Sequence, residues 1–238
     1  MRVIIVAGGS GSRMQANIPK QFLEICGKPI LIHTIMAFAD ACEGDLPVVV
    51  ICPSQVKRWK ELCKIHNFTL PHQIAEGGAT RFHSVKNGLS LIPDDEKGLI
   101  AIHDGVRPLV DRQTITNCVR EAAKYGCAVP TVPVIDSVRE VSGQTSRMLN
   151  RSSLRLIQTP QIFDIALIKK AYQQEYLTSF TDCASVFESA GNDIHLTNGC
   201  INNIKITSMH DLFAAEAMMS RKTEDRRPQD KKTEDMKT

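Results

Sequence analysis

The sequence predicts an α/β protein with a Rossmann-like, mostly parallel sheet that carries helices on both faces. Short, almost continuously apolar runs alternate with helical patterns along most of the 238 residues, as in parallel sheets that are buried on both sides. Hydrophobic residues make up 42% of the chain, enough for one substantial core. The first apolar run also leads directly into a glycine-rich loop, which is typical of nucleotide-binding α/β folds.

The apolar runs predict the strands of this sheet, and amphipathic segments between them predict its helices. We expect strands at residues 3–6, 48–52, 72–75, 99–102 and 128–134, and helices at residues 30–41, 55–66, 81–91 and 112–125. Ligands of such sheets bind at the carboxyl ends of the strands. The loops after the first and fourth strands are therefore the expected functional loops.

The alternation stops at residue 135. Strands at residues 138–141 and 154–158, joined by the polar stretch 142–153, predict a protruding β-arm within residues 136–160. An isolated hairpin is only marginally stable in water, so we expect the arm to pack against a second subunit. The main domain spans residues 1–220. Its remaining part is predicted to form helices at 165–176, 183–190 and 209–220 and strands at 194–196 and 203–206. The charged tail, 221–238, is expected to be disordered.

Composition excludes several classes of partner. The net charge is only +3, which does not suggest binding to nucleic acid. The eight cysteines include no C-x-x-C pair and lie mostly in apolar stretches, so a reduced compartment fits better than a disulfide framework or a zinc site. The sequence shows no signal peptide and no apolar stretch of about 18 residues. We expect a cytoplasmic protein without a membrane partner.

The loop at residues 7–14, Ala-Gly-Gly-Ser-Gly-Ser-Arg-Met, is the most informative motif. Its glycines allow backbone N–H groups to approach a ligand, and Arg13 and Lys20 can balance the charge of a polyphosphate. A dinucleotide site would need a small residue at Met14 and an acidic residue after the second strand, which ends Ile51-Cys52-Pro53. No P-loop motif is present. A nucleoside triphosphate that releases pyrophosphate fits best, and an ordinary turn with two surface cations is the alternative.

A second motif, Ile102-His-Asp-Gly-Val-Arg-Pro108, follows the fourth strand. Asp104 at a strand's carboxyl end can hold a divalent metal or a sugar hydroxyl, and Arg107 can bind a phosphate oxygen. A surface Asp–Arg pair is the alternative. We expect His103 to pack at the strand end rather than to bind a ligand.

Three weaker motifs lie further along the chain: Gly77-Gly-Ala-Thr-Arg-Phe-His-Ser-Val85, Gln158-Thr-Pro-Gln161 preceded by Asn150-Arg151, and Asn202-Asn-Ile-Lys-Ile-Thr207. The two glycines of the first could contact a flat base, with Arg81 and Ser84 near one another at a helix start. A helix that is simply capped by Thr80 explains the same residues. A lone strand lysine such as Lys205 is usually solvated.

Taken together, the five motifs resemble those of the 2-C-methyl-D-erythritol 4-phosphate cytidylyltransferases of the non-mevalonate isoprenoid pathway. The resemblance covers residues 3–217 and rests on A-x-G-x-G-x-R-M with P-K-Q, H-D-x-x-R-P, Q-T-P-Q, T-D-x-A-S (residues 181–185) and N-I-K-I-T. It implies that 1–220 is a nucleotidyltransferase domain that transfers CMP from CTP to 2-C-methyl-D-erythritol 4-phosphate, with release of pyrophosphate. It further implies Mg²⁺ or another divalent cation as cofactor, and a homodimer formed through the arm.

The resemblance also implies a role for each site residue. Arg13, Lys20 and Lys205 would be catalytic, because they would stabilise charge at the α-phosphorus. The nucleotide would be bound by Ala7, Gly8, Gly9, Gly11, Gly78, Arg81 and Ser84. The polyol phosphate would be bound by Asp104, Arg107, Ser137, Arg151 and Thr159, with Asp104 also next to the metal. Arg151 and Thr159 would act across the dimer interface.

Four sites depart from the family pattern. Ala7-Gly8-Gly9 replaces the frequent Ala-Ala-Gly, and Gly105 replaces a usual alanine. Ala79 stands where an acidic residue is often found near the base, and Cys183 replaces a common glutamate in T-D-E-A. The sequence offers no explanation for Cys183.

Two other functions are compatible with the same motifs. Ribitol-5-phosphate cytidylyltransferases share A-G-G-x-G-x-R-M and P-K-Q-F, but the spacing of Asn150-Arg151 to Gln158-Thr159 favours the methylerythritol enzymes. A non-catalytic nucleotide-binding protein is the alternative from another class. Retention of Arg13, Lys20, Arg151 and Lys205 argues against it.

Overall fold

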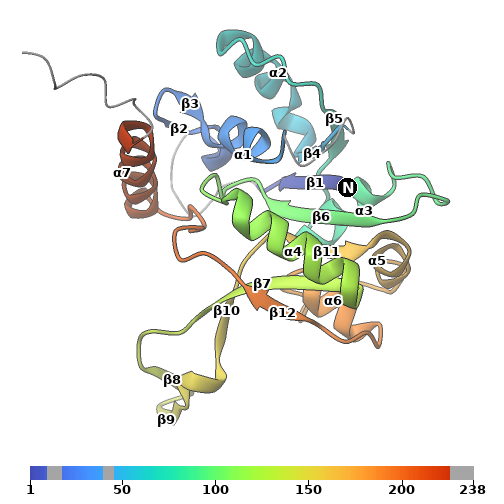
Figure 1. Cartoon of the computed structure of the whole chain (residues 1–238), viewed down its shortest axis with the longest axis vertical. Helices are drawn as coiled ribbons and strands as arrows, with labels where there is room; N and C mark the ends of the chain where they lie inside the picture. Colours follow the sequence, from blue (N-terminus) through green and yellow to red (C-terminus); the bar gives the residue numbers. More distant parts are fainter. Residues whose placement is uncertain (10–17, 40–45, 226–238) are drawn as a thin grey trace, which may run out of the picture.

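The computed structural model describes residues 1–9, 18–39 and 46–225, with side chains up to residue 221. An eight-stranded sheet with the order β10-β7-β11-β6-β1-β4-β5 forms its centre, and β12 also pairs with β7 (Figure 1). These strands are β1 (Arg2–Ala7), β4 (Val48–Ile51), β5 (Gln73–Glu76), β6 (Leu99–Asp104), β7 (Cys127–Pro133), β10 (Arg155–Ile157), β11 (Gln161–Asp164) and β12 (Leu196–Asn198). Within this sheet β10 and β11 run opposite to the other strands, which confirms the expected mostly parallel α/β class.

Helices cover both faces of the sheet because alternate strand residues point to opposite sides. Val3, Ile5 and Ala7 of β1 pack with α1 (Ile30–Phe38), α2 (Val56–Ile65) and α4 (Arg112–Tyr125). Ile4 packs on the opposite face with α3 (Arg81–Leu89), α5 (Ile165–Ala171) and α6 (Cys183–Ser189). β1 lies between β4 and β6, so the strand connections on its two sides run in opposite directions across the sheet. Such a switch point opens a crevice at the carboxyl ends of the strands.

Two predicted features of the sheet were wrong. Residues 161–164, which we did not predict as a strand, form β11, which inserts antiparallel between β6 and β7. Residues 203–206 form no strand, although Ile206 N donates one backbone hydrogen bond to Val106 O (2.9 Å). Asn203 instead bonds through its side chain, which competes with a regular ladder.

The protruding arm has a different strand pairing from the one predicted (Figure 1). β8 (Val138–Ser142) pairs with β9 (Thr145–Leu149), which lies inside the stretch that we expected to be a polar connection. Gly143 has φ +59°, which allows the tight turn between Ser142 and Thr145. The predicted partner, residues 154–158, instead returns to the main sheet as β10, beside β7.

A small hairpin of β2 (Glu24–Ile25) and β3 (Lys28–Pro29) lies beside the last helix, α7 (Met209–Asp225). Ile25 and Ile30 share an apolar cluster with Leu212 and Ala215 of α7. The helix continues through residues 221–225, so this part of the predicted disordered tail is helical. The rest of the tail lies outside the described residues. Within the part of the chain that the structure covers, no helix combines the length and apolar character needed to cross a bilayer.

Candidate active site

The glycine loop after β1 is fixed by a buried glutamine next to Lys20. Lys20 and Gln21 belong to the 3₁₀ helix η2 (Lys20–Phe22), and the Gln21 side chain is buried. Gln21 Nε2 donates to Ala7 O (2.9 Å) and to Gly9 O (3.3 Å). One amide therefore joins the segment of Lys20 to both ends of the described part of the loop. The predicted residues Gly11 and Arg13 lie outside the described residues.

A second glycine pair, Gly77-Gly78 after β5, lies against Gly8 in the loop after β1. A Cβ on Gly77 would lie 3.1 Å from Gly8 Cα, and a Cβ on Gly8 would lie 3.0 Å from Ser84 Oγ. Ser84 Oγ accepts a hydrogen bond from Gly78 N (3.0 Å). The structure thus brings together three residues predicted to bind the nucleotide, Gly8, Gly78 and Ser84. Thr80 also caps α3, so the structural explanation of this motif holds beside the functional one.

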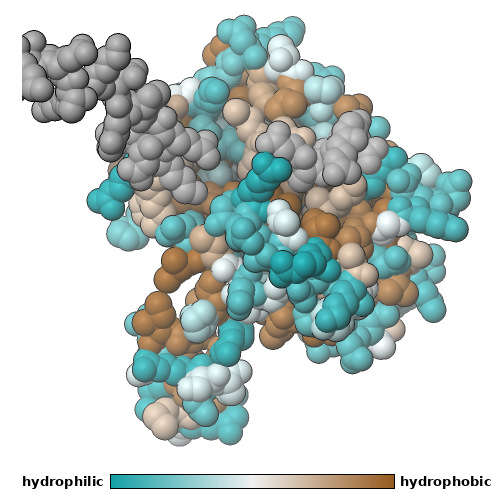
Figure 2. All heavy atoms as spheres, in the orientation of Figure 1, coloured by the Kyte–Doolittle hydropathy of each residue, from teal (hydrophilic) through white to brown (hydrophobic). Residues whose placement is uncertain are grey.

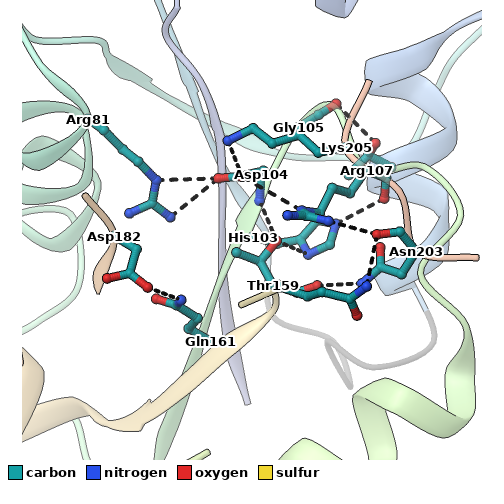
Figure 3. A network of polar contacts seen from close by, with 12 residues as sticks. Arg81, His103, Asp104, Gly105, Arg107, Thr159, Gln161, Asp182, Asn203 and Lys205 are labelled. Atoms are coloured by element: carbon teal, nitrogen blue, oxygen red, sulfur yellow. Dashed lines mark hydrogen bonds and ion pairs between the residues drawn. The ribbon is translucent and has the colours of Figure 1, made fainter. Parts of the chain in front are cut away.

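The centre of the candidate site is Asp104, at the carboxyl end of β6 (Figure 3). Its Oδ1 accepts from Arg81 Nε (3.3 Å), and its Oδ2 forms an ion pair with Lys205 Nζ (2.8 Å). Arg107 Nε lies 3.8 Å from Oδ2. The prediction that Arg81, Arg107 and Lys205 contribute to one site is therefore consistent with their common contact to Asp104, although they come from segments far apart in sequence.

Three cations surround one carboxylate, so the cluster has an excess of positive charge. Burial of Asp104 opposes its ionisation, but Arg81, Lys205 and Arg107 together hold its pKa well below the usual range. Burial also lowers the pKa of Arg107, against the attraction of Asp104. The arrangement is suited to a polyanion, because a bound phosphate would replace the missing negative charge.

His103 positions the residues around Asp104 rather than binding a ligand. Its Nε2 lies 3.1 Å from Arg107 O, its Nδ1 lies 3.0 Å from Thr159 Oγ1, and Asp104 N donates to the same Oγ1 (3.1 Å). A carbonyl can only accept, so Nε2 carries the proton and Nδ1 accepts from the Thr159 hydroxyl. Burial lowers the pKa of His103 to about 4, which keeps this neutral form. The ring also packs on Phe38, as predicted for a strand-end residue.

Lys205 is held in place by the residue two positions before it. Asn203 is fully buried, and its Nδ2 donates to Thr159 O (2.8 Å). Arg107 Nη1 donates to Asn203 O (2.7 Å). The Q-T-P-Q and N-I-K-I-T motifs are thus joined directly, and both lie next to Asp104. Thr159 is buried in the cluster of its own chain, whereas the prediction had it act across the dimer interface.

The sequence did not indicate the part played by Gln161. Its Nε2 donates to Asp182 Oδ2 (2.7 Å), and its Oε1 accepts from the backbone N–H groups of Cys183 (3.0 Å) and Ala184 (3.1 Å). Gln161 therefore fixes the start of α6. Gln161 and Gln21 bond mostly to backbone groups of distant segments, and sequence spacing carries no signal for such contacts.

The residues present do not fit a metal site built by the protein alone. Among the described residues no group of three His, Cys, Asp or Glu side chains could hold a metal ion. Both oxygens of Asp104, the predicted ligand, face cationic nitrogens instead. A dedicated site needs several oxygen ligands with free lone pairs.

Two predicted substrate residues lie apart from the cluster within this chain. Ser137 is exposed at the start of the arm, and Arg151 lies in η5 (Arg151–Ser153), between β9 and β10. Arg151 Nη1 donates to Ile135 O at the base of the arm. No described contact joins either residue to Asp104.

Comparisons with known proteins point to one family. The family model of 2-C-methyl-D-erythritol 4-phosphate cytidylyltransferase matches residues 1–221. The protein of that name from Phocaeicola vulgatus is 46% identical over 218 residues, which cover 91% of this chain and 98% of the relative. The one from Bacteroides fragilis is 45% identical over 216 residues, with the same coverage of both chains.

Solved structures show the same fold. The 4-diphosphocytidyl-2C-methyl-D-erythritol synthase of Anaerococcus prevotii superposes with a TM-score of 0.77 and 26% identity, over 92% of this chain and 98% of that one. The Thermus thermophilus 2-C-methyl-D-erythritol 4-phosphate cytidylyltransferase gives a TM-score of 0.74 and 30% identity, with the same coverage. The names agree with the methylerythritol alternative rather than the ribitol one. The chain belongs to the 2-C-methyl-D-erythritol 4-phosphate cytidylyltransferase family of nucleotidyltransferases.

Proposed function

We propose that this enzyme transfers CMP from CTP to 2-C-methyl-D-erythritol 4-phosphate, a step of isoprenoid precursor biosynthesis. The products are pyrophosphate and 4-diphosphocytidyl-2-C-methyl-D-erythritol. The observation that carries the proposal is the cationic cluster around Asp104, which lies at the carboxyl edge of the sheet where the loops after β1 and β5 meet. Both substrates are polyanions, and the cluster has unbalanced positive charge to bind them.

In the proposed reaction an oxygen of the polyol phosphate attacks the α-phosphorus of CTP. The bond between the α-phosphorus and the bridging oxygen breaks, and pyrophosphate leaves with that electron pair. Arg13, Lys20 and Lys205 stabilise the negative charge that builds up on the oxygens around the α-phosphorus. Positioning and charge stabilisation suffice for such a transfer, so no covalent nucleophile of the protein is needed.

Asp104 orients the cations of the site. Its carboxylate holds Arg81 and Lys205 on opposite oxygens, which directs them before substrate binds. Backbone N–H groups of Ala7, Gly8, Gly9 and Gly11 are proposed to face the triphosphate, and Gly78, Arg81 and Ser84 the nucleoside. A divalent cation such as Mg²⁺ would lower the charge of the triphosphate; we infer that phosphate oxygens, rather than protein side chains, would be its main ligands, because Asp104 is engaged by cations.

We propose that the enzyme is a homodimer in which the arm of one copy supplies Arg151 and Ser137 to the site of the other. The arm carries exposed apolar side chains, and their exposure does not stabilise a folded monomer. Figure 2 shows apolar surface where the arm joins the body. The exposed fractions are 65% for Ile135, 71% for Val141 and 75% for Met148, and Leu156, on the adjoining β10, is 55% exposed. A second copy of the chain would bury this surface.

The test is pyrophosphate release by the purified protein with CTP and either 2-C-methyl-D-erythritol 4-phosphate or ribitol 5-phosphate. We expect turnover with the first substrate. Turnover with ribitol 5-phosphate alone would support the ribitol enzyme, and no turnover with either would support a non-catalytic nucleotide-binding protein. Lys205→Ala should lower kcat about 100-fold or more, as loss of a charge-stabilising group does. Lys60→Ala, on the exposed face of α2, is the matched control and should leave kcat unchanged.

A further inference from the structure

The sulfur of Cys183 faces two hydrogen-bond donors in the interior of the protein. Arg81 Nη1 donates to Cys183 Sγ (3.0 Å), and the Tyr172 hydroxyl donates to the same sulfur (3.2 Å). The Cys183 side chain has no solvent exposure. Burial raises the pKa of this thiol, so the sulfur acts as an uncharged acceptor near neutral pH.

The backbone at Cys183 is held from two sides. Gln161 Oε1 accepts from the N–H groups of both Cys183 and Ala184, and Asp182 and Ser185 form a capping box at the start of α6. The sulfur therefore has a fixed place relative to β11. Thr159 and Asp104 are joined by a hydrogen bond at the same end of β11. The positions of Cys183 and Asp104 are therefore both fixed relative to β11.

The guanidinium of Arg81 lies between this sulfur and Asp104. Its Nε and Nη2 face Asp104 Oδ1, both at 3.3 Å, while Nη1 faces Cys183. A planar guanidinium that is bound on two sides cannot turn about the bond that joins it to the rest of the side chain. An uncharged sulfur gives this restraint without cancelling the charge of the arginine.

We propose that Cys183 is a positioning residue for Arg81: it fixes the plane of the guanidinium and leaves its charge available to an anionic nucleotide. This role rests on the proposed function, in which Arg81 contacts the nucleotide. Alanine at this position would leave Nη1 buried without its acceptor. Serine would keep an uncharged acceptor.

The first experiment compares Cys183→Ala and Cys183→Ser in the pyrophosphate-release assay. Cys118→Ala is the matched control, because Cys118 is equally buried but packs in the apolar core. We expect Cys183→Ala to raise the KM for CTP about tenfold, the effect of losing a hydrogen bond to a charged group. Cys183→Ser should restore most of the affinity. A KM in Cys183→Ala equal to that in Cys118→Ala would overturn the proposal.

A double-mutant cycle separates a role through Arg81 from a general effect on folding. In an Arg81→Lys background, where the planar fork is absent, Cys183→Ala should cause no further rise in KM; a full additional tenfold rise would refute the role. Calorimetric titration with CTP gives the same comparison as binding constants. If the wild-type protein binds CTP but turns over neither polyol phosphate, the proposed function fails, while the binding cycle still tests Cys183.

Discussion

His103 is a single residue whose two ring nitrogens join two segments of the site, residues 103–107 and Thr159. The chain from Arg107 O through the imidazole to the Thr159 hydroxyl and Asp104 N uses only the neutral ring. Protonation would place a second N–H against a hydroxyl oxygen that already accepts from the backbone. The residue is therefore a fixed structural element whose protonation state matters to the fold.

This state makes stability depend on pH. An unfolded histidine has a pKa of about 6.5, and burial lowers that of His103 to about 4. Between these values the unfolded chain binds a proton that the folded chain does not. Stability should therefore decrease as the pH is lowered, by up to about 3 kcal/mol. Urea unfolding at about pH 7.5 and about pH 4.5 measures this loss. His103→Gln, which keeps an amide donor for Arg107 O, should reduce it.

The exposed His210, on α7, provides the control for that measurement. His210→Gln should retain the full pH dependence of the wild-type protein. An unchanged pH dependence in His103→Gln would mean that another group causes the loss.

Asp104 is the one carboxylate that contacts Arg81, Arg107 and Lys205 among the described residues. Asp104→Asn keeps the shape and leaves these cations without their counter-charge. We expect a loss of about 2–4 kcal/mol in unfolding free energy, below the value for a fully buried pair because Lys205 is 41% exposed. Urea unfolding gives the difference from the wild type, and Asp95→Asn, at an exposed side chain, is the control and should be neutral.

The stabilising effect of Asp104 should be lost as the pH falls, whereas a group with a raised pKa loses its effect as the pH rises. Asp104 has a depressed pKa in the folded protein, so its contribution is complete above the unfolded value of about 3.9. The difference between the wild type and Asp104→Asn should therefore stay constant from neutral pH to about pH 4 and shrink only below it. A difference that already shrinks near pH 6 would show that Asp104 is not strongly ion-paired.

At the scale of elements, η2 and the end of β1 are joined by Gln21. Gln21→Met has a similar volume and removes the bonds to Ala7 O and Gly9 O. We expect kcat/KM for CTP to fall at least about tenfold, because Lys20 and the loop lose their common anchor. Steady-state kinetics with pyrophosphate detection measures this.

Gln113→Met, on the exposed side of α4, is the matched substitution. It should leave kcat/KM for CTP unchanged. If Gln21→Met lowers stability but leaves kcat/KM at the wild-type value, then the anchor serves the fold alone.

The elements that the sequence predicts well are those with a strong local signal. β1 and β4 are continuous apolar runs, and α4 has an Asp111 N-cap and a left-handed Gly126 after its last turn. β11 was missed because four residues after a proline carry little pattern, and no pattern reveals strand direction. The arm pairing was wrong because hydrophobicity alone does not choose between two possible partners of β8.

The same limit applies to the candidate site. Asp104, Arg107 and Ser84 could be predicted because each follows a strand or begins a helix within a recognisable motif. The residues that hold them, such as His103 and Asn203, act through contacts with distant backbone and side-chain groups. Those contacts exist only after the sheet has formed, so spacing along the chain does not encode them.

At the scale of the whole molecule, the proposed dimer predicts complementation between two defective chains. Arg151→Ala has an intact cluster but a defective arm, and Lys205→Ala has the opposite defect. In a heterodimer the Lys205→Ala chain supplies a normal Arg151 to the intact cluster of its partner. Random mixing should therefore restore about a quarter of wild-type turnover, because half of the dimers are mixed and each has one complete site.

The mixture is made by unfolding and refolding the two purified variants together, and pyrophosphate release is measured before and after mixing. Arg139→Ala, elsewhere on the arm, is the control partner: its own site and its Arg151 are both intact, so it should be active without mixing. Activity that does not rise on mixing Arg151→Ala with Lys205→Ala would show that each chain completes its own site.

The two ends of the arm are held next to each other in the main sheet, where Pro133 of β7 pairs with Arg155 of β10. The segment between them leaves and re-enters the body at one point, so its length can change without moving Asp104 or the sheet that carries it. In the proposed dimer, the choice of subunit partner is therefore encoded in a part of the gene separate from the cluster around Asp104. Exchanging residues 134–154 between relatives should yield chains that keep their catalytic cluster and acquire a new pairing preference.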